Sequence, residues 1–325
     1  MDEWTNHATF RRMVIPQLRT VTRTQGNNEA LKTGAVTPHG FAFEFEEVPV
    51  LVQAFRRMVR GNEFDVSEMA LTTYLVAKAH GARFTAVPAF LVRGFHHGAI
   101  FHDPSSEVRE PKDLEGRRVG VSRGYTVTTG VWARAVLSEE YGVDLDKVTW
   151  VLSGDEHVAG FRPPSNVVPL EPGRSLEESV TGGDLAAVIG PRPESSALAP
   201  LIPDAGEAGF TALRERGLYP INHLVVIRDQ LLAERPGLAA DVFDAFARAK
   251  QLYVDRLRAG VGDSPTDLMY RRVMEVTGAD PLPYGIEPNR AVLERLMRHA
   301  IDQRILERPL PLDELFAEAT RTLTA

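Results

Sequence analysis

The sequence has no cysteine among its 325 residues. Disulfide bridges, thiolate zinc sites, iron–sulfur clusters and a cysteine nucleophile are therefore excluded. Long apolar runs are also missing, since no stretch approaches the roughly 18 residues that a membrane-spanning helix needs. Charged residues at positions 2, 3, 11 and 12 interrupt the N-terminal segment, which does not resemble a secretory signal. We therefore expect a cytoplasmic protein.

Cofactor-binding and hydrolase motifs are missing as well. No G-x-G-x-x-G or other Gly-rich phosphate loop is present, and Gly182-Gly183 is typical of a turn. Ser67 lacks the G-x-S-x-G context of a hydrolase nucleophile. No H-E-x-x-H or comparable metal-ligand spacing occurs. We expect no cofactor and no metal.

The charge balance is weakly acidic, with 37 Lys and Arg against 44 Asp and Glu and a formal net charge of −7. Such a surface argues against an electrostatic nucleic-acid binder, but it is compatible with a local basic pocket for an anion. The length and the 43% hydrophobic content suit two domains, or one large one, with a sizeable core. We expect a small-molecule partner rather than a nucleic acid or a membrane, and leave a homo-oligomer open.

Strand and helix patterns alternate along most of the chain. Residues 41–48 place three Phe side chains on one face of a strand, and residues 49–60 follow as an amphipathic helix. Further strands are predicted at 18–25, 64–66, 85–92, 96–101, 118–122, 148–152, 184–189 and 222–227, and helices at 67–80, 127–141, 176–181, 235–260, 265–277, 289–303 and 312–323. This alternation indicates mostly parallel sheets in two α/β lobes, with the helical tail returning to the first lobe.

Residues that follow the strands are the first candidates for a site, because open α/β sheets bind ligands at the carboxyl ends of their strands. These positions hold Arg23, Ser67, Glu68, Arg93, His96, His97, Arg123, Thr126, Arg192 and His223. Arg123 also precedes a helix, where backbone N–H groups and the helix dipole favour an anion, and Thr126 and Thr128 add hydroxyl donors. Arg192 lies between two prolines, which stiffen its loop.

Four segments carry distinctive motifs in a fixed order along the chain. They are 63–74 (EFDVSEMALTTY), 112–132 (KDLEGRRVGVSRGYTVTTGVW), 219–228 (YPINHLVVIR) and 282–290 (LPYGIEPNR). Together they resemble the 4,5-dihydroxyphthalate decarboxylase family. The resemblance implies the fold of type II periplasmic solute-binding proteins, with two lobes of mixed sheets flanked by helices, two crossing strands and a ligand cleft. We expect lobe one at 1–110 and 221–325, and lobe two at 111–220.

The resemblance also implies a reaction, the cofactor-independent decarboxylation of a hydroxylated aromatic dicarboxylic acid. The substrate would be 4,5-dihydroxyphthalate or a close analogue, and the product protocatechuate with CO₂. Such chemistry needs Arg side chains to clamp carboxylates, an acid/base group and a cleft that excludes water. The alternative is a solute-binding protein of the ABC-transporter type that holds an organic anion without turnover. The lack of a recognisable export signal and the number of acid/base groups favour the enzyme.

The candidate residues divide by role. His223 suits proton transfer because histidine titrates near neutral pH, and Glu68 is placed to act on a phenolic hydroxyl. His96 and His97 are adjacent, so on a strand only one of them can enter the cleft. The substrate-binding candidates are Arg123, Arg192, Arg93, Ser67, Thr126 and Arg23.

Each candidate also has a plain structural role open to it. Glu68 is favourable in the first turn of a helix for dipole reasons, and Ser67 suits an N-cap. Arg93 would pair with Glu68 in a structural contact, and His223 equally suits a hydrogen-bonded core position. A metal cluster would draw on His96, His97, His102 and His223 with Glu68 or Asp103, without supporting spacing. The run 155–157 suits a polar loop, with lining of lobe two as the alternative.

Overall fold

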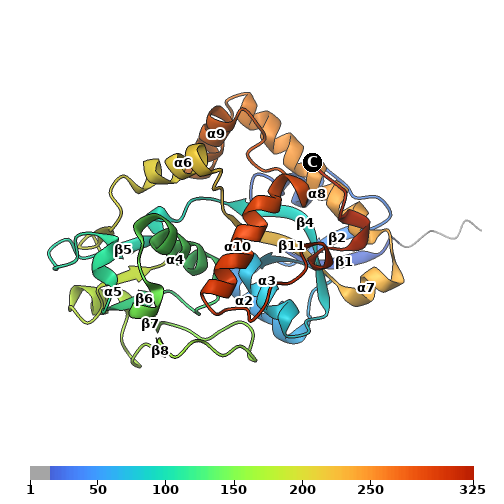
Figure 1. Ribbon diagram of the computed structural model, residues 1–325. Helices are drawn as coiled ribbons and strands as arrows, with labels where there is room; N and C mark the ends of the chain where they lie inside the picture. The colour runs from blue at the N-terminus through green and yellow to red at the C-terminus, as the bar shows by residue number, and fades with distance from the viewer. Residues whose placement is uncertain (1–14) are drawn as a thin grey trace, which may run out of the picture.

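The computed structural model describes residues 15–325 and contains two mixed β-sheets (Figure 1). The first sheet consists, in spatial order, of β2 (Ala42–Phe45), β1 (Gln17–Val21), β3 (Val66–Ala70), β11 (Ile221–Arg228) and β4 (Phe84–Arg93). The second consists of β10 (Ala199–Pro200), β5 (Ile100–His102), β9 (Ala187–Ile189), β6 (Arg118–Val121), β7 (Thr149–Leu152) and β8 (Val167–Pro169). Each sheet is the centre of one lobe.

Strand directions match the expected mixed sheets. β1 is parallel to β2 and β3, whereas β11 is antiparallel to both β3 and β4. In the second sheet β6, β7, β8 and β9 are parallel, and β5 is antiparallel to its neighbours. The chain crosses between the sheets after β4 and returns in β11, so the α/β fold with two lobes is confirmed.

Helices cover the two sheets and the junction between them. Those beside the first sheet are α1 (Glu29–Lys32), α2 (Leu51–Gly61), α3 (Leu71–Ala79), α7 (Asp229–Glu234) and α8 (Leu238–Arg258). The second sheet carries α4 (Thr128–Tyr141) and α5 (Leu176–Thr181), and α6 (Ala205–Arg216) packs against α9 (Pro265–Thr277). Within residues 15–325, no helix combines the length and the apolar character that a membrane crossing requires.

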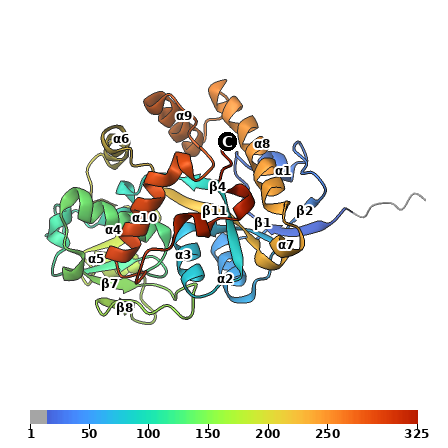
Figure 2. The ribbon, with the colours of Figure 1, turned by 45° about the vertical axis from the view of Figure 1, so that its right-hand side comes forward.

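The C-terminal part of the chain contacts both lobes. Its last segment lies on the first sheet, because Phe316 bridges to Ala86 of β4. Helix α10 (Arg290–Asp302) instead lies across the junction, beside α4 (Figures 1 and 2). There, His299 lies 3.0 Å from Glu139 of α4, and Gln303 accepts a hydrogen bond from the buried Arg134 at 2.8 Å. The expected packing of the tail on lobe one is thus extended by a contact with lobe two.

The helix predicted at 67–80 is present but begins only at Leu71, and the helix predicted at 312–323 does not form. Ser67 and Glu68 do not begin a helix but lie inside β3, whose five residues are all buried between β1 and β11. Ladder hydrogen bonds on both sides therefore outweigh the local helical pattern. The predicted helix at 312–323 is replaced by two 3₁₀ turns, Leu312–Leu315 and Glu318–Thr320, because the intervening segment attaches to β4.

The boundary expected at residue 110 also differs from the structure. β5 precedes that position, yet it pairs with β9 and β10 of the second sheet. The crossing from the first sheet to the second is therefore complete before residue 100. Trp132 of α4 then ties the lobes together, since its indole N–H donates to the Ile221 carbonyl of β11 at 3.0 Å.

Candidate functional site

A carboxylate–imidazole pair lies on two neighbouring strands of the first sheet. In the antiparallel β3–β11 ladder, Val225 is opposite Glu68 and His223 is opposite Ala70, so Glu68 and His223 are diagonal neighbours on one face. Nδ1 of His223 lies 2.6 Å from Oε1 of Glu68. The other oxygen, Oε2, accepts the backbone N–H of Arg23 at 2.9 Å. The pair joins two residues that the sequence predicted as catalytic.

This arrangement fixes the orientation of the histidine ring. Glu68 is fully buried, whereas the side chain of His223 is 18% exposed. A carboxylate that accepts a hydrogen bond from Nδ1 holds the proton on that nitrogen and presents Nε2 for proton transfer. The ring of Phe55 packs edge-on against His223, with centroids 5.2 Å apart. The imidazole therefore has one defined position, and its Nε2 has no hydrogen-bond partner among residues 15–325.

His223 lines a cavity of about 290 Å³ between the two lobes. The size is near the lower end of the roughly 300–1,000 Å³ typical of ligand pockets, and suits a single substituted ring. Lobe one contributes Arg23, Pro49, Val50, Leu51, Val52, Phe55, Ala70, Thr73, Asn222 and His223, and lobe two contributes Arg123, Val127, Thr128, Thr129 and His157. One wall, at the start of α2, is thus apolar, and the charged groups Arg23 and Arg123 follow strands, as expected, whereas the lining threonines lie on α3 and α4.

Two arginines line the cavity from opposite lobes. Arg23 follows β1 and Arg123 follows β6. Within residues 15–325, neither guanidinium has an ion-pair or hydrogen-bond partner; the hydrogen bonds of both residues involve backbone atoms alone. Arg123 has a left-handed backbone, with φ of 72°, and its N–H donates to the Ser153 hydroxyl. The site therefore offers two open cations for carboxylates, as the sequence predicted for both residues.

His157 is a lining residue that the sequence offered only as the alternative to a polar loop at 155–157. It lies in the inter-lobe loop, which we define as residues 153–158, and its Nδ1 is 3.0 Å from the Thr73 hydroxyl of α3. Burial, together with the positive charges of Arg56 and Arg123, lowers the pKa of His157 to about 4. The only signal in the sequence was its place just after a predicted strand.

The expected anion site at the start of α4 is already filled by the protein itself. The amide cradle, formed by the N–H groups of Tyr125 and Thr126, binds the carboxylate of Glu156. The hydroxyl of Thr126 donates to the same carboxylate at 2.6 Å. A Cβ on Gly124 would lie 2.7 Å from a Glu156 oxygen, so a larger residue there would displace this carboxylate. Thr126 is therefore not placed to bind substrate, and Thr128 is bonded to Thr72 at 2.6 Å.

The adjacent histidines lie behind the cavity rather than on its wall. Nε2 of His96 is 2.9 Å from Oδ1 of the lining residue Asn222, and burial lowers the pKa of His96 to about 4. His97 begins a 3₁₀ turn, and its Nε2 lies 3.0 Å from the carboxylate of Glu140 in α4. Neither ring has direct access to a ligand in the cavity, because both side chains are buried and neither lines it.

Three other binding candidates also lie outside the cavity. Arg93 is buried and donates to Asn289 at 2.7 Å and to the Tyr219 carbonyl at 2.6 Å, rather than to Glu68. Ser67 donates to the Glu68 carbonyl within β3 and neither caps a helix nor faces a ligand. Arg192 is exposed on the loop after β9 and does not line the cavity. These positions depend on contacts between distant segments, which strand-end position alone does not reveal.

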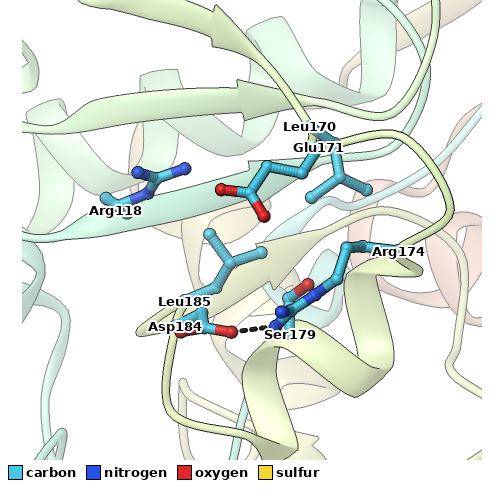
Figure 3. A pocket seen from close by; sticks show the side chains of 7 residues that line it. All are labelled: Arg118, Leu170, Glu171, Arg174, Ser179, Asp184 and Leu185. Atoms are coloured by element: carbon cyan, nitrogen blue, oxygen red, sulfur yellow. Dashed lines mark hydrogen bonds and ion pairs between the residues drawn. The ribbon is translucent and has the colours of Figure 1, made fainter.

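A second pocket lacks this combination of groups. The pocket in Figure 3 lies on lobe two, where Arg118 begins β6, at the opposite end of the strand from Arg123. Its Arg174 is paired with Asp184, and Glu171 points toward Arg118 (Figure 3). The residues that line that pocket include no histidine, and its two arginines are accompanied by two carboxylates. For residues 15–325, no three His, Asp or Glu side chains gather in a way that would hold a metal ion, so the histidines considered as a cluster are dispersed.

The fold is shared with solved two-lobed proteins. The desulfurization enzyme DSZB is 17% identical and superposes with a TM-score of 0.52, covering 93% of this chain and 96% of its own. The aliphatic sulphonate binding protein SsuA from Escherichia coli is 11% identical, with a TM-score of 0.50 and coverage of 95% and 100%. The class is therefore the α/β fold of periplasmic binding proteins, which includes both binding proteins and enzymes.

Sequence comparison narrows the relationship within this class. A family model described as NMT1/THI5 like matches residues 54–161. The 4,5-dihydroxyphthalate decarboxylase of Comamonas testosteroni is 29% identical over 286 residues, which cover 82% of this chain and 86% of the relative. That of Pseudomonas putida is 34% identical over 151 residues, 44% of this chain and 58% of the relative. The chain is thus a relative of 4,5-dihydroxyphthalate decarboxylases, and the resemblance carried by the motifs is confirmed.

Proposed function

We propose that the protein is a carboxy-lyase that decarboxylates a hydroxylated aromatic dicarboxylic acid, with 4,5-dihydroxyphthalate or a close analogue as substrate. The observation that carries the proposal is that His223, bonded to the buried Glu68, lines one cavity with Arg23 and Arg123, whose guanidinium groups have no partner among residues 15–325. A solute-binding site needs the cations, but it does not need an imidazole held by a buried carboxylate. The decarboxylase relatives support the same reading.

Substrate binding follows from the charges and the apolar wall. The open guanidinium groups of Arg23 and Arg123 bind the two ring carboxylates, and the bidentate geometry of Arg suits this task. Leu51, Val52 and Phe55 at the start of α2 cover the ring and exclude water, which strengthens each electrostatic contact. The ring is thereby placed beside His223.

The chemical step is a proton-for-carboxylate exchange on the ring. Nε2 of His223 in its protonated form transfers a proton to the ring carbon that bears the departing carboxylate, and the hydroxyl para to that carbon supplies electron density. The carbon–carbon bond then breaks, its electron pair returns to the ring, and CO₂ leaves. Glu68 stabilises the imidazolium before transfer and keeps the ring orientation fixed. The product is a dihydroxybenzoate, protocatechuate for the named substrate.

The test is turnover by the purified protein. Incubation with 4,5-dihydroxyphthalate should change the ring absorbance and release one CO₂ for each substrate consumed. In D₂O the product should carry one ring deuterium at the vacated carbon, and a chelator should leave the rate unchanged. Binding with no CO₂ would instead identify a solute-binding protein. The absence of both binding and turnover would overturn the assignment of the substrate.

A further inference from the structure

The cavity contains a second histidine that the proposed proton transfer does not use. His157 reaches the cavity from lobe two and is 4% exposed. Its ring packs edge-on against Phe55, with centroids 6.2 Å apart, and Phe55 also contacts His223. The two histidines therefore flank one aromatic side chain, and each comes from a different lobe.

The hydrogen bonds of His157 define what it can offer a ligand. In the described part of the chain, the Thr73 hydroxyl has one hydrogen-bond partner, Nδ1 of His157. When that hydroxyl donates, Nδ1 is an acceptor and the ring hydrogen lies on Nε2. Because burial and nearby arginines hold the pKa of His157 at about 4, the ring is uncharged near neutral pH. It can therefore donate one N–H without adding a positive charge.

We propose, on the basis of the proposed function, that His157 binds substrate, its Nε2–H donating to the same carboxylate that Arg123 holds. Both residues follow adjacent strands of the second sheet, Arg123 after β6 and His157 after β7, and both line the cavity. A guanidinium and a neutral N–H donor together satisfy more of a carboxylate's lone pairs than either does alone. Lobe two then holds one carboxylate, and Arg23 on lobe one holds the other.

The inter-lobe loop is held in place by the exposed end of α2. The Asp155 carboxylate pairs with Arg56 at 2.6 Å and with Arg60 at 3.0 Å. Arg60 also donates to the backbone carbonyls of Glu156 at 2.8 Å and His157 at 3.1 Å. Since α2 belongs to lobe one and the loop to lobe two, Arg60 is a positioning residue that keeps His157 in the cavity.

The test is a binding experiment with phthalate, which lacks the hydroxyl groups that the reaction needs. Calorimetric titration should show phthalate binding weakened roughly tenfold to hundredfold by His157→Leu and much less by His157→Gln, which retains a donor. The thermal midpoint of each variant shows whether it is folded. If the His157→Leu protein does not fold, the phthalate affinity of the His157→Gln protein is compared with that of the unmodified protein.

Double-variant cycles identify the group that His157 contacts. If His157 and Arg123 share one carboxylate, the combined effect of His157→Leu and Arg123→Ala should be smaller than the product of the single effects. In the matched cycle with Arg23→Ala, the combined effect on phthalate affinity should equal the product of the two single effects. Equal behaviour in both cycles, or unchanged binding by His157→Leu, would overturn the inference. Phthalate binding with these couplings but no CO₂ from dihydroxyphthalate would refute only the decarboxylation, whereas no phthalate binding by the unmodified protein would refute both.

The positioning role has its own readout. Arg60→Ala should raise the KM for 4,5-dihydroxyphthalate roughly twofold to fivefold and leave kcat unchanged, because it loosens the loop but not the Glu68–His223 pair. Arg57→Ala is the matched control on the same helix, since Arg57 pairs with Glu46 and Glu63 instead. An unchanged KM for Arg60→Ala, or an equal rise for Arg57→Ala, would refute the role of Arg60.

Discussion

Replacement of Glu68 by Gln tests the proposed proton transfer most directly. The Glu68 carboxylate accepts from His223 on one oxygen and from the Arg23 N–H on the other, and both acceptors are needed. Gln keeps the shape but offers only one carbonyl oxygen. Its NH₂ group must face one of the two donors, and a buried unsatisfied donor costs about 1–3 kcal/mol. If the NH₂ group of the introduced Gln instead donates to Nδ1 of His223, the hydrogen of the neutral ring lies on Nε2. The protonated ring that the reaction needs is then no longer stabilised by a carboxylate.

The expected result is a fall in kcat of about 10²–10⁴-fold, the usual contribution of general acid–base catalysis. Phthalate affinity, measured by titration, should stay within about threefold, because both arginines are untouched. Glu140→Gln is a matched control: Glu140 also binds a histidine, His97, but away from the cavity. It should keep its turnover. A Glu68→Gln protein with more than a tenth of the original kcat, or an equal loss in Glu140→Gln, would refute the reasoning.

Other predictions address binding, catalysis and pH. His223→Ala should lower kcat at least about 100-fold with phthalate affinity nearly unchanged; unaltered turnover would remove it from the mechanism. Arg123→Ala should raise KM roughly tenfold to hundredfold, whereas the exposed Arg192→Ala should change it less than about twofold, by steady-state kinetics. Between its ordinary pKa of 6.5 and about 4, His96 binds a proton only in the unfolded chain, so stability falls as the pH falls through this window. Between pH 7 and 4.5, the free energy of unfolding measured in urea should therefore fall about 2 kcal/mol less for His96→Gln than for the unmodified protein.

Elements with clear local patterns could be predicted from the sequence. Helix α4 was expected at 127–141 and occupies Thr128–Tyr141, because Gly142 ends it in a left-handed conformation with φ of 65°. Strand β3 was mistaken for the start of a helix, since a strand buried on both sides shows no alternation of apolar and polar residues. The expected cytoplasmic location stays a prediction.

Site residues could be predicted where strands meet at the cleft. They could not be predicted where a contact with a residue far away in the sequence sets the position of the side chain. His223, Arg23 and Arg123 line one cavity because β1 and β6 end at the cleft and β11 begins there, and the buried Glu68 of β3 is bonded to His223. Arg93 is directed elsewhere by Asn289, which lies 196 residues away in the chain. Contacts at such separations follow from packing of the whole chain, which residue patterns do not encode.

The carboxylate of Glu156 in the amide cradle has a consequence for selectivity. Since the protein supplies its own anion to the N–H groups of Tyr125 and Thr126, no incoming acid can use them. Discrimination among small acids then depends on side chains, each of which a point substitution can exchange. Such a pocket can acquire a new preferred acid while its scaffold remains intact, whereas a backbone receptor would accept many oxyanions alike.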